Sequence, residues 1–199
     1  IVERDGQHRS YVHIDQGAVA WESALGHVTD VHPGRQGSVY IIATRPDEAL
    51  ENQGRLFCFD FGGLQVWDFD PRSPFRGERN ESVDWMALAD NGTVLVRTVA
   101  ENGTDHQYYG LSQAGEELWR YEVQSQVAQS TLRGDSLIVA RHLVDPFDPF
   151  SRDCHGDFEL CAIRAVEVVS IDVNDGQRQW ARGIRPDIEP IQLGFLADG

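Results

Sequence analysis

Short apolar segments recur along the chain, and each is followed by a polar residue, a glycine and a tryptophan. In 168–171, for example, the apolar segment leads directly into Asp172, then a glycine turn, then a second short segment that carries the tryptophan. The glycine precedes the tryptophan by four residues in four places: Gly17 and Trp21, Gly63 and Trp67, Gly115 and Trp119, and Gly176 and Trp180. A strand, a polar glycine turn and a second strand predict a β-hairpin at each of them.

A second hairpin is predicted between consecutive tryptophans. Its earlier strands are expected at 28–31, 83–88 and 127–132, and its later strands at 39–42, 94–96 and 137–139, each after a glycine turn. Each unit then holds four antiparallel strands, and the tryptophans of successive units are 46, 52 and 61 residues apart. Four short strands in a period of about 40 to 60 residues are typical of a β-propeller blade. Segment 56–59 is apolar at every position, as in a blade covered on both faces, and four matches in one register disfavour a β-sandwich.

We therefore predict an all-β fold, a β-propeller segment of four-stranded antiparallel blades with almost no helix. Residues 1–199 are expected to form a single propeller domain or part of one. It consists of a partial blade at 1–24, three blades at about 25–70, 81–123 and 125–183, and the start of the next blade at 188–199. A partial ring exposes apolar blade faces, so we expect the chain to be a fragment, or a second chain to complete the ring. Trp67, Trp119 and Trp180 are expected to be mostly buried between blades.

Each unit has a strand, then the pattern Asp-x-x-Gly or a close variant of it, then a tryptophan four residues after the glycine, as in 169–180 and 111–120. This pattern resembles the repeat of the pyrroloquinoline-quinone (PQQ)-like β-propellers. The resemblance covers nearly the whole chain. It implies that each tryptophan lies on the outermost strand of its blade and packs between neighbouring blades. It also implies a ring of seven or eight blades.

Members of this superfamily are of two kinds, quinone-dependent dehydrogenases and cofactor-free scaffolds that bind proteins. The enzymes carry two sequence-adjacent cysteines over the quinone and calcium ligands at the channel, whereas Cys58, Cys154 and Cys161 of this chain are not adjacent. The resemblance therefore favours a non-catalytic scaffold for protein–protein interaction or assembly, with no cofactor. The alternative is a PQQ-dependent oxidoreductase, or its subunit, whose catalytic residues lie outside this segment. A carbohydrate- or metal-binding surface module is a third hypothesis.

Charge excludes some kinds of partner. The chain has 17 Lys and Arg residues, all of them arginine, against 32 Asp and Glu residues, for a net charge of -15. This balance argues against binding nucleic acid by neutralising phosphates, and against docking on an anionic membrane surface. No apolar run approaches the ~18 residues of a membrane-spanning helix, so no direct membrane span is expected.

Cys154 and Cys161 lie in the longest insertion of the repeat, 144–163. Their spacing across a turn suits a disulfide, while free thiols, or a zinc site with His155, remain alternatives. A disulfide implies an oxidising compartment, so we expect an extracytoplasmic protein, periplasmic, secreted or at the cell surface. Cys58 lies in the middle of a strand and is expected to be a buried thiol.

The same insertion carries acidic and aromatic side chains. Its carboxylates, Asp145, Asp148, Asp153, Asp157 and Glu159, are weak calcium candidates, and a solvated acidic loop is the competing interpretation. Its phenylalanines, Phe147, Phe150 and Phe158, are candidates for binding a protein partner, the alternative being that they cap the chain's own blades. Asp172–Gly176 resembles a calcium loop, but the other three repeats have fewer acids at this turn, which favours a hairpin turn.

No catalytic constellation is apparent in the sequence. None of the seven histidines belongs to a known nucleophile motif, and no zinc-protease or phosphate-binding motif occurs. We therefore predict no catalytic, cofactor-binding or firm metal-binding residue. Glycosylation sequons begin at Asn80, Asn91 and Asn102, and at the last two the Asn-Gly pair is also what a tight turn requires.

Overall fold

The computed structural model describes residues 11–15, 18–23, 25–44, 54–71, 81–100, 103, 105–124, 127–143 and 165–184. Nearly all of the regular structure within these ranges is β-strand. The strands are β1 (Tyr11–Asp15), β2 (Ala18–Ser23), β3 (Val28–Pro33), β4 (Val39–Ala43), β5 (Arg55–Phe59), β6 (Gln65–Phe69), β7 (Glu81–Leu88), β8 (Val94–Ala100), β9 (Asp105–Leu111), β10 (Glu117–Gln124), β11 (Val127–Arg133), β12 (Ser136–Leu143), β13 (Ala165–Asp172) and β14 (Arg178–Ile184). The helical structure described is a 3-10 turn at Arg35–Gly37.

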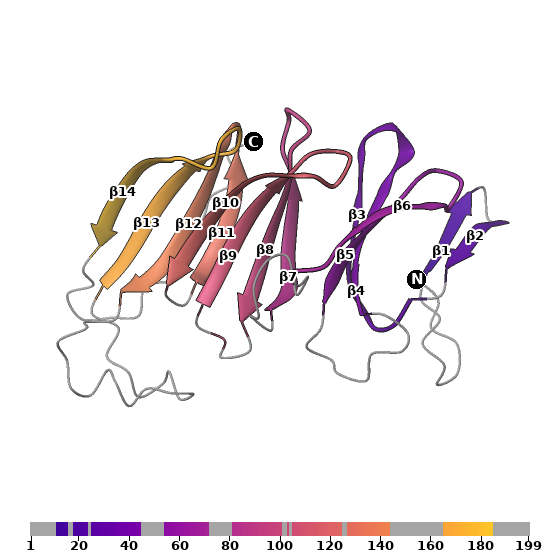
Figure 1. The fold of residues 1–199 in the computed structure, drawn as a ribbon, viewed down its shortest axis with the longest axis horizontal. Coiled ribbons are helices and arrows are strands. Elements are labelled where there is room, and N and C mark those ends of the chain that lie inside the picture. Colours follow the sequence, from indigo (N-terminus) through magenta and orange to yellow (C-terminus); the bar gives the residue numbers. More distant parts are fainter. Residues whose placement is uncertain are drawn as a thin grey trace.

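The strands form a series of antiparallel sheets that follow one another in chain order (Figure 1). A two-stranded hairpin, β1-β2, precedes three four-stranded sheets, β3 to β6, β7 to β10 and β11 to β14, which we call the first, second and third blades. Within each blade the strands pair in sequence order, so the last strand of each, which carries the tryptophan, is an edge strand. The predicted all-β fold of four-stranded antiparallel blades, nearly free of helix, is confirmed.

Apolar clusters join successive blades, and we call the two interfaces the first seam and the second seam. The first seam, between the first and second blades, holds Tyr40, Ile42, Leu56, Cys58, Phe69, Val83, Met86, Val94, Val96, Tyr109 and Leu111. The second seam, between the second and third blades, holds Ala89, Leu95, Tyr108, Trp119, Val123, Leu137, Val139, Val169, Ile171 and Val173. Alternate residues of a strand lie on opposite faces of its blade. In β5, Leu56 and Cys58 enter the first seam, whereas Phe57 and Phe59 pack in a separate cluster on the other face, which is why β5 is buried at every position.

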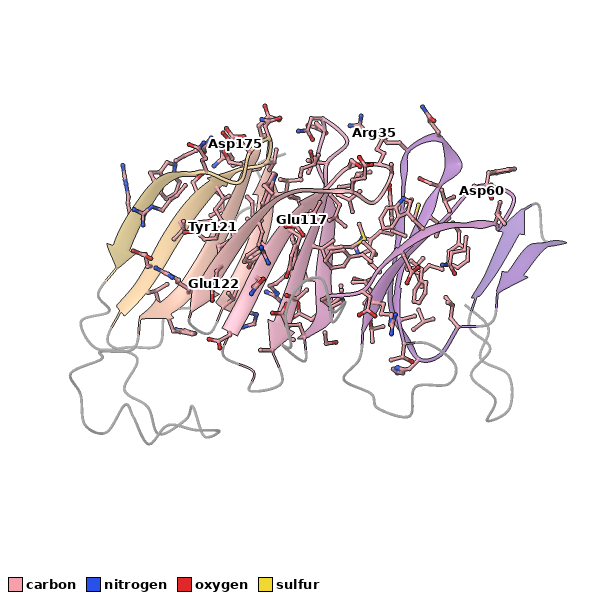
Figure 2. All side chains as sticks on the ribbon, viewed as in Figure 1. Arg35, Asp60, Glu117, Tyr121, Glu122 and Asp175 are labelled. Atoms are coloured by element: carbon pink, nitrogen blue, oxygen red, sulfur yellow. The ribbon has the colours of Figure 1, made fainter. Side chains whose placement is uncertain are left out.

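Short turns connect the strands at one end of the blades, the upper edge in Figure 1. One of them reaches across the first seam. Arg35, in the turn between β3 and β4, donates from Nη2 to the backbone carbonyl oxygens of Ala89 and Asp90 in the second blade. Figure 2 shows this arginine at the upper edge, between the two blades. The short-turn end of the first seam is thus held by a charge-assisted contact as well as by apolar packing.

Candidate functional site

The tryptophans of the first two blades hold the seams at their outer edge. The indole nitrogen of Trp67 donates a 2.8 Å hydrogen bond to the carbonyl oxygen of Gln113 in the next blade. Trp119 makes the same bond, also 2.8 Å long, to the carbonyl oxygen of Val173. In each case the acceptor directly follows the polar residue of the repeat, Ser112 or Asp172, between the third and fourth strands of the following blade. One tryptophan therefore links the first blade to the second, and another links the second blade to the third.

The glycine of the repeat is explained by these contacts. Gly115 has a φ of +81°, and a Cβ added to it would lie 2.7 Å from the ring of Trp67. Gly176 has a φ of +72°, and its added Cβ would meet the ring of Trp119 at the same distance. A side chain at either position is excluded both by the backbone conformation and by the indole above it. The four-residue spacing within one unit therefore encodes contacts between different units: Gly115 and Gly176 each receive the tryptophan of the blade before them.

The expectation that Trp67, Trp119 and Trp180 are all mostly buried is only partly right. Trp119 is 7% exposed and belongs to the cluster of the second seam. Trp67 is partly buried, packing on the first-seam cluster with its ring centroid 5.8 Å from that of Tyr40. For Trp180 the expectation is wrong, because 43% of it is exposed. No described turn lies beyond the third blade to cover this indole in the way that Gly176 covers Trp119.

A β-bulge precedes each tryptophan and was not predicted from the sequence. Trp67 pairs with Cys58 while Gln65 pairs with Phe59, so Val66 is the extra residue. The same shift makes Leu118 the extra residue beside Trp119. A bulge re-aims the neighbouring side chains, and here it leaves the extra residue on the outside while the tryptophan enters the seam.

The bulges place apolar side chains on the outer surface. Val66 and Leu118 are both exposed, as are Phe61 and Leu64 in the turn that precedes β6. Glu117 and Glu122, which Figure 2 labels on β10 together with Tyr121, are also exposed. The signal that could have revealed the outer apolar residues is an apolar residue directly before the repeat tryptophan.

Polar side chains occupy the ends of the seams away from the short turns. In the first seam the buried Glu81 accepts a 2.6 Å hydrogen bond from the hydroxyl of Thr98, and the hydroxyl of Tyr109 donates to Gln107 over 2.7 Å. The hydroxyl of Tyr109 also lies 3.4 Å from the same carboxylate oxygen of Glu81. The buried carboxylate of Glu81 therefore has hydrogen-bonding groups around it inside the seam.

The second seam has a charged counterpart. Arg97 of β8 donates two 2.8 Å hydrogen bonds to Asp84 of β7, one to each carboxylate oxygen. Its Nη1 also lies 3.3 Å from the hydroxyl of Ser130 in the third blade, and that hydroxyl is 2.5 Å from the hydroxyl of Tyr108. Burial lowers the pKa of Arg97, but the hydrogen bonds and charge of Asp84 outweigh it and raise the pKa overall. Burial raises the pKa of Tyr108, so both groups keep their protons and the network stays intact.

Several candidate residues from the sequence fall in turns. The carboxylate of Asp172 accepts hydrogen bonds from the backbone and side-chain nitrogens of Asn174, both 2.8 Å long, and these bonds lower its pKa. Asn91 likewise accepts from the backbone of Thr93 over 2.9 Å and donates to Asn174 over 2.7 Å. The carboxylate of Asp172 and the side-chain oxygen of Asn91 thus serve their own turns, in agreement with the hairpin-turn interpretation, while the side-chain nitrogen of Asn91 reaches the turn of the third blade. Within the described ranges, no three potential ligands gather around one metal position.

The remaining candidates of the sequence lie outside the described residues. They are the cysteine pair Cys154 and Cys161, the carboxylates Asp145, Asp148, Asp153, Asp157 and Glu159, the phenylalanines Phe147, Phe150 and Phe158, and the repeat glycine Gly17. All of them except Gly17 belong to the insertion 144–163, which lies between β12 and β13, the second and third strands of the third blade, as predicted. Cys58 is described: it is a free, buried thiol, and burial raises its pKa to about 11. No helix among the described residues is long and apolar enough to cross a membrane.

Comparison with known proteins identifies the family. The family model described as "Outer membrane protein assembly factor BamB" matches residues 9–189. No curated protein sequence matches the chain significantly.

Three solved structures share parts of the architecture at low identity. An uncharacterized protein, lmo1340, from Listeria monocytogenes EGD-e is 9% identical with a TM-score of 0.44, over 81% of this chain and 40% of that one. A GH43 β-1,3-galactosidase is 8% identical with a TM-score of 0.42, over 78% and 31%. BamB from Moraxella catarrhalis is 17% identical with a TM-score of 0.38, over 83% and 52%. The chain thus spans less than two thirds of the length of each of these proteins.

The match of the family model extends from before β1 to beyond β14 and includes every described tryptophan of the repeat. The strand order, the edge position of those tryptophans and the four-stranded blades agree with it. This chain therefore belongs to the family of the outer membrane protein assembly factor BamB, with its PQQ-like β-propeller repeat.

Proposed function

We propose that this chain is a non-catalytic β-propeller scaffold that binds a protein partner within an extracytoplasmic complex. The observation that carries the proposal is the family match over residues 9–189, whose description names an assembly factor. The proposal requires no cofactor. It is supported by the polar side chains at the seams, which bind one another: Arg97 binds Asp84, and Glu81 binds Thr98. These side chains serve the structure.

The insertion between β12 and β13 is the part of the chain that we propose contacts the partner. β12 ends at Leu143 and β13 begins at Ala165, which is the end of the third blade opposite its short turns. A long connection on the rim of a rigid sheet is a common place for recognition, and Phe147, Phe150 and Phe158 supply apolar side chains for an interface. A disulfide between Cys154 and Cys161 would limit the entropy lost on docking.

A second contact is proposed to complete the ring. Trp67 and Trp119 each bind a carbonyl oxygen and cover a glycine of the following blade, whereas Trp180 is substantially exposed. A further blade that presents the same glycine turn, from this chain or from another, would bury Trp180. This blade contact is independent of the partner that the insertion recognises.

The partner proposal is tested by co-purification from the envelope fraction of the source cell, with bound proteins quantified by mass spectrometry. The test variant combines F147A, F150A and F158A, and the matched control combines L64S and V66T, which also remove exposed apolar side chains. We expect the insertion variant to lose one enriched partner at unchanged stability, and the control to retain it. An unchanged set of partners with the insertion variant would contradict the assignment of the insertion. PQQ that co-purifies and supports substrate oxidation would replace the scaffold function by the enzyme alternative.

A further inference from the structure

His106 is a buried histidine with no hydrogen-bond partner. It lies on β9, is 5% exposed, and neither ring nitrogen has a partner in the described part of the chain. A neutral imidazole buried in this way forfeits hydrogen bonds, and a charged one would cost far more. The other buried polar groups of the second blade, such as Thr98 and Gln107, do have partners. An unpartnered ionisable group inside a seam is therefore a feature to explain.

The register places His106 on the side of the second blade that faces the third. It pairs with Val99 and Val123, and it shares its face with Tyr108, two residues further along β9. Tyr108 belongs to the second-seam cluster, and its hydroxyl is 2.5 Å from that of Ser130 in the third blade. His106 therefore lies at the polar end of the second seam.

The charges around His106 oppose a second positive charge there. Burial lowers its pKa from the ordinary value of 6.5, and the guanidinium of Arg97 lowers it further, while the more weakly acting Asp84 and Asp105 raise it. Asp84 is already committed to Arg97 through two hydrogen bonds. On β10, Glu122 neighbours Val123 but is exposed. On β9, Tyr108 keeps its proton because burial raises its pKa.

Among its described residues, the third blade offers no free carboxylate to a protonated His106. The charged groups that β12 and β13 direct towards the second blade are Arg141 and Glu167, and these form an ion pair with 2.5 Å between Nη2 and Oε2. β11 contributes the hydroxyl of Ser130, which is engaged with Arg97 and Tyr108. Protonation of His106 in the closed seam would thus add a buried, unpaired cation beside an arginine.

The repeat shows that a histidine is not needed at this position. His106 lies six residues before Ser112, which opens the outer turn of its blade, and the residue six before Asp172 in the third blade is Val166. Val166 is 4% exposed, so in the third blade an apolar side chain occupies this position and is as buried as His106 is in the second blade. In the first blade the corresponding residue is Gly54. The ionisable group is thus specific to the second seam.

We propose that His106 makes the second seam acid-sensitive, so that transient opening between the second and third blades becomes more frequent as the pH falls below about 6.5, while opening of the first seam does not. In the closed seam His106 is neutral, and in the open seam water solvates the imidazolium. Below pH 6.5 the open form takes up one proton that the closed form does not. The opening equilibrium constant therefore rises about tenfold per pH unit, until the pH reaches the lowered pKa of the closed form.

Two indole N–H groups report the two seams in one spectrum. The indole of Trp119 is bonded across the second seam to Val173, and that of Trp67 across the first seam to Gln113. Their exchange rates with water are measured by NMR from about pH 7.5 to about pH 5, and the Trp67 rate corrects for the intrinsic effect of pH. We expect the ratio of the Trp119 rate to the Trp67 rate to rise about tenfold per unit below pH 6.5.

H106V, which installs the residue found at this position in the third blade, is expected to make that ratio independent of pH. H142V is the matched control, because His142 follows the seam-facing Arg141 and so lies on the opposite side of β12, and it should retain the wild-type response. An H106V response equal to wild type would overturn the proposal. So would a wild-type His106 whose NMR titration gives a pKa at or above 6.5, a measurement that needs no variant to fold.

Discussion

Replacing Trp119 by alanine tests the way in which the blades are joined. Trp119 is 7% exposed, covers Gly176 of the next blade and donates its indole N–H to the carbonyl oxygen of Val173. Truncation of a buried tryptophan removes its packing and leaves a cavity, which typically costs about 3 to 5 kcal/mol. The freed carbonyl of Val173 adds a penalty within this range because it loses its partner inside the seam.

A graded series separates burial from the hydrogen bond. W119F retains most of the ring but removes the donor, so we expect it to cost about 1 to 2 kcal/mol. W67A should fall between W119A and W180A, because Trp67 makes the same bond but is only partly buried. W180A should cost less than about 1 kcal/mol, because Trp180 is 43% exposed and the third blade has no described successor to hold it.

Urea unfolding followed by far-ultraviolet circular dichroism measures the series without depending on tryptophan fluorescence. Equal urea dependence of the unfolding free energy among variants would show that all of them unfold the same structure. A loss below about 1 kcal/mol for W119A would refute the docking of Trp119 in the seam. An equal loss for W180A and W119A would refute the argument that the following blade, rather than the blade itself, determines the contribution of each tryptophan.

Three further predictions concern glycine and cysteine. G115A should destabilise the chain by at least about 2 kcal/mol in urea unfolding, because its Cβ meets the ring of Trp67, whereas G134A, with a φ of +55° and nothing within 4 Å, should cost only about 1 kcal/mol of backbone strain. With the other two cysteines changed to serine, Cys58 should react with a thiol reagent at neutral pH only after urea unfolding. Its pKa of about 11 leaves almost no thiolate in the folded chain. Rapid labelling of the folded chain would contradict this prediction. In the unchanged protein, mass spectrometry without reductant should show the loss of two hydrogen atoms, with Cys154 linked to Cys161 in the peptide map.

The sequence by itself determined the repeat and therefore the architecture. The four-residue step from glycine to tryptophan and the apolar segments on both sides of it required paired strands covered on both faces, and Leu56, Phe57 and their neighbours are indeed buried throughout β5. Local pattern suffices here because strand pairing, turn chemistry and two-sided burial are all read within one unit of the repeat. The outermost position of each tryptophan followed from the resemblance to known propellers, and the strand order confirms it.

Only the tertiary structure decided what each copy of the repeat does. Trp119 and Trp180 occupy the same place in the repeat, but their burial differs because it depends on the blade that follows. The bulges that expose Val66 and Leu118 shift the pairing by one residue, which a pattern of apolar positions does not specify.

The seam charges illustrate the same limit. In the sequence Arg97 and His106 are two polar residues in neighbouring strands, and nothing distinguishes a partner from a buried neighbour. In the folded chain Arg97 binds Asp84, and His106 lies in the second seam without a hydrogen bond. The physical reason is that the free energy of an ionisable group depends on its solvation and on charges from strands distant in sequence, which are fixed only when the blades pack together.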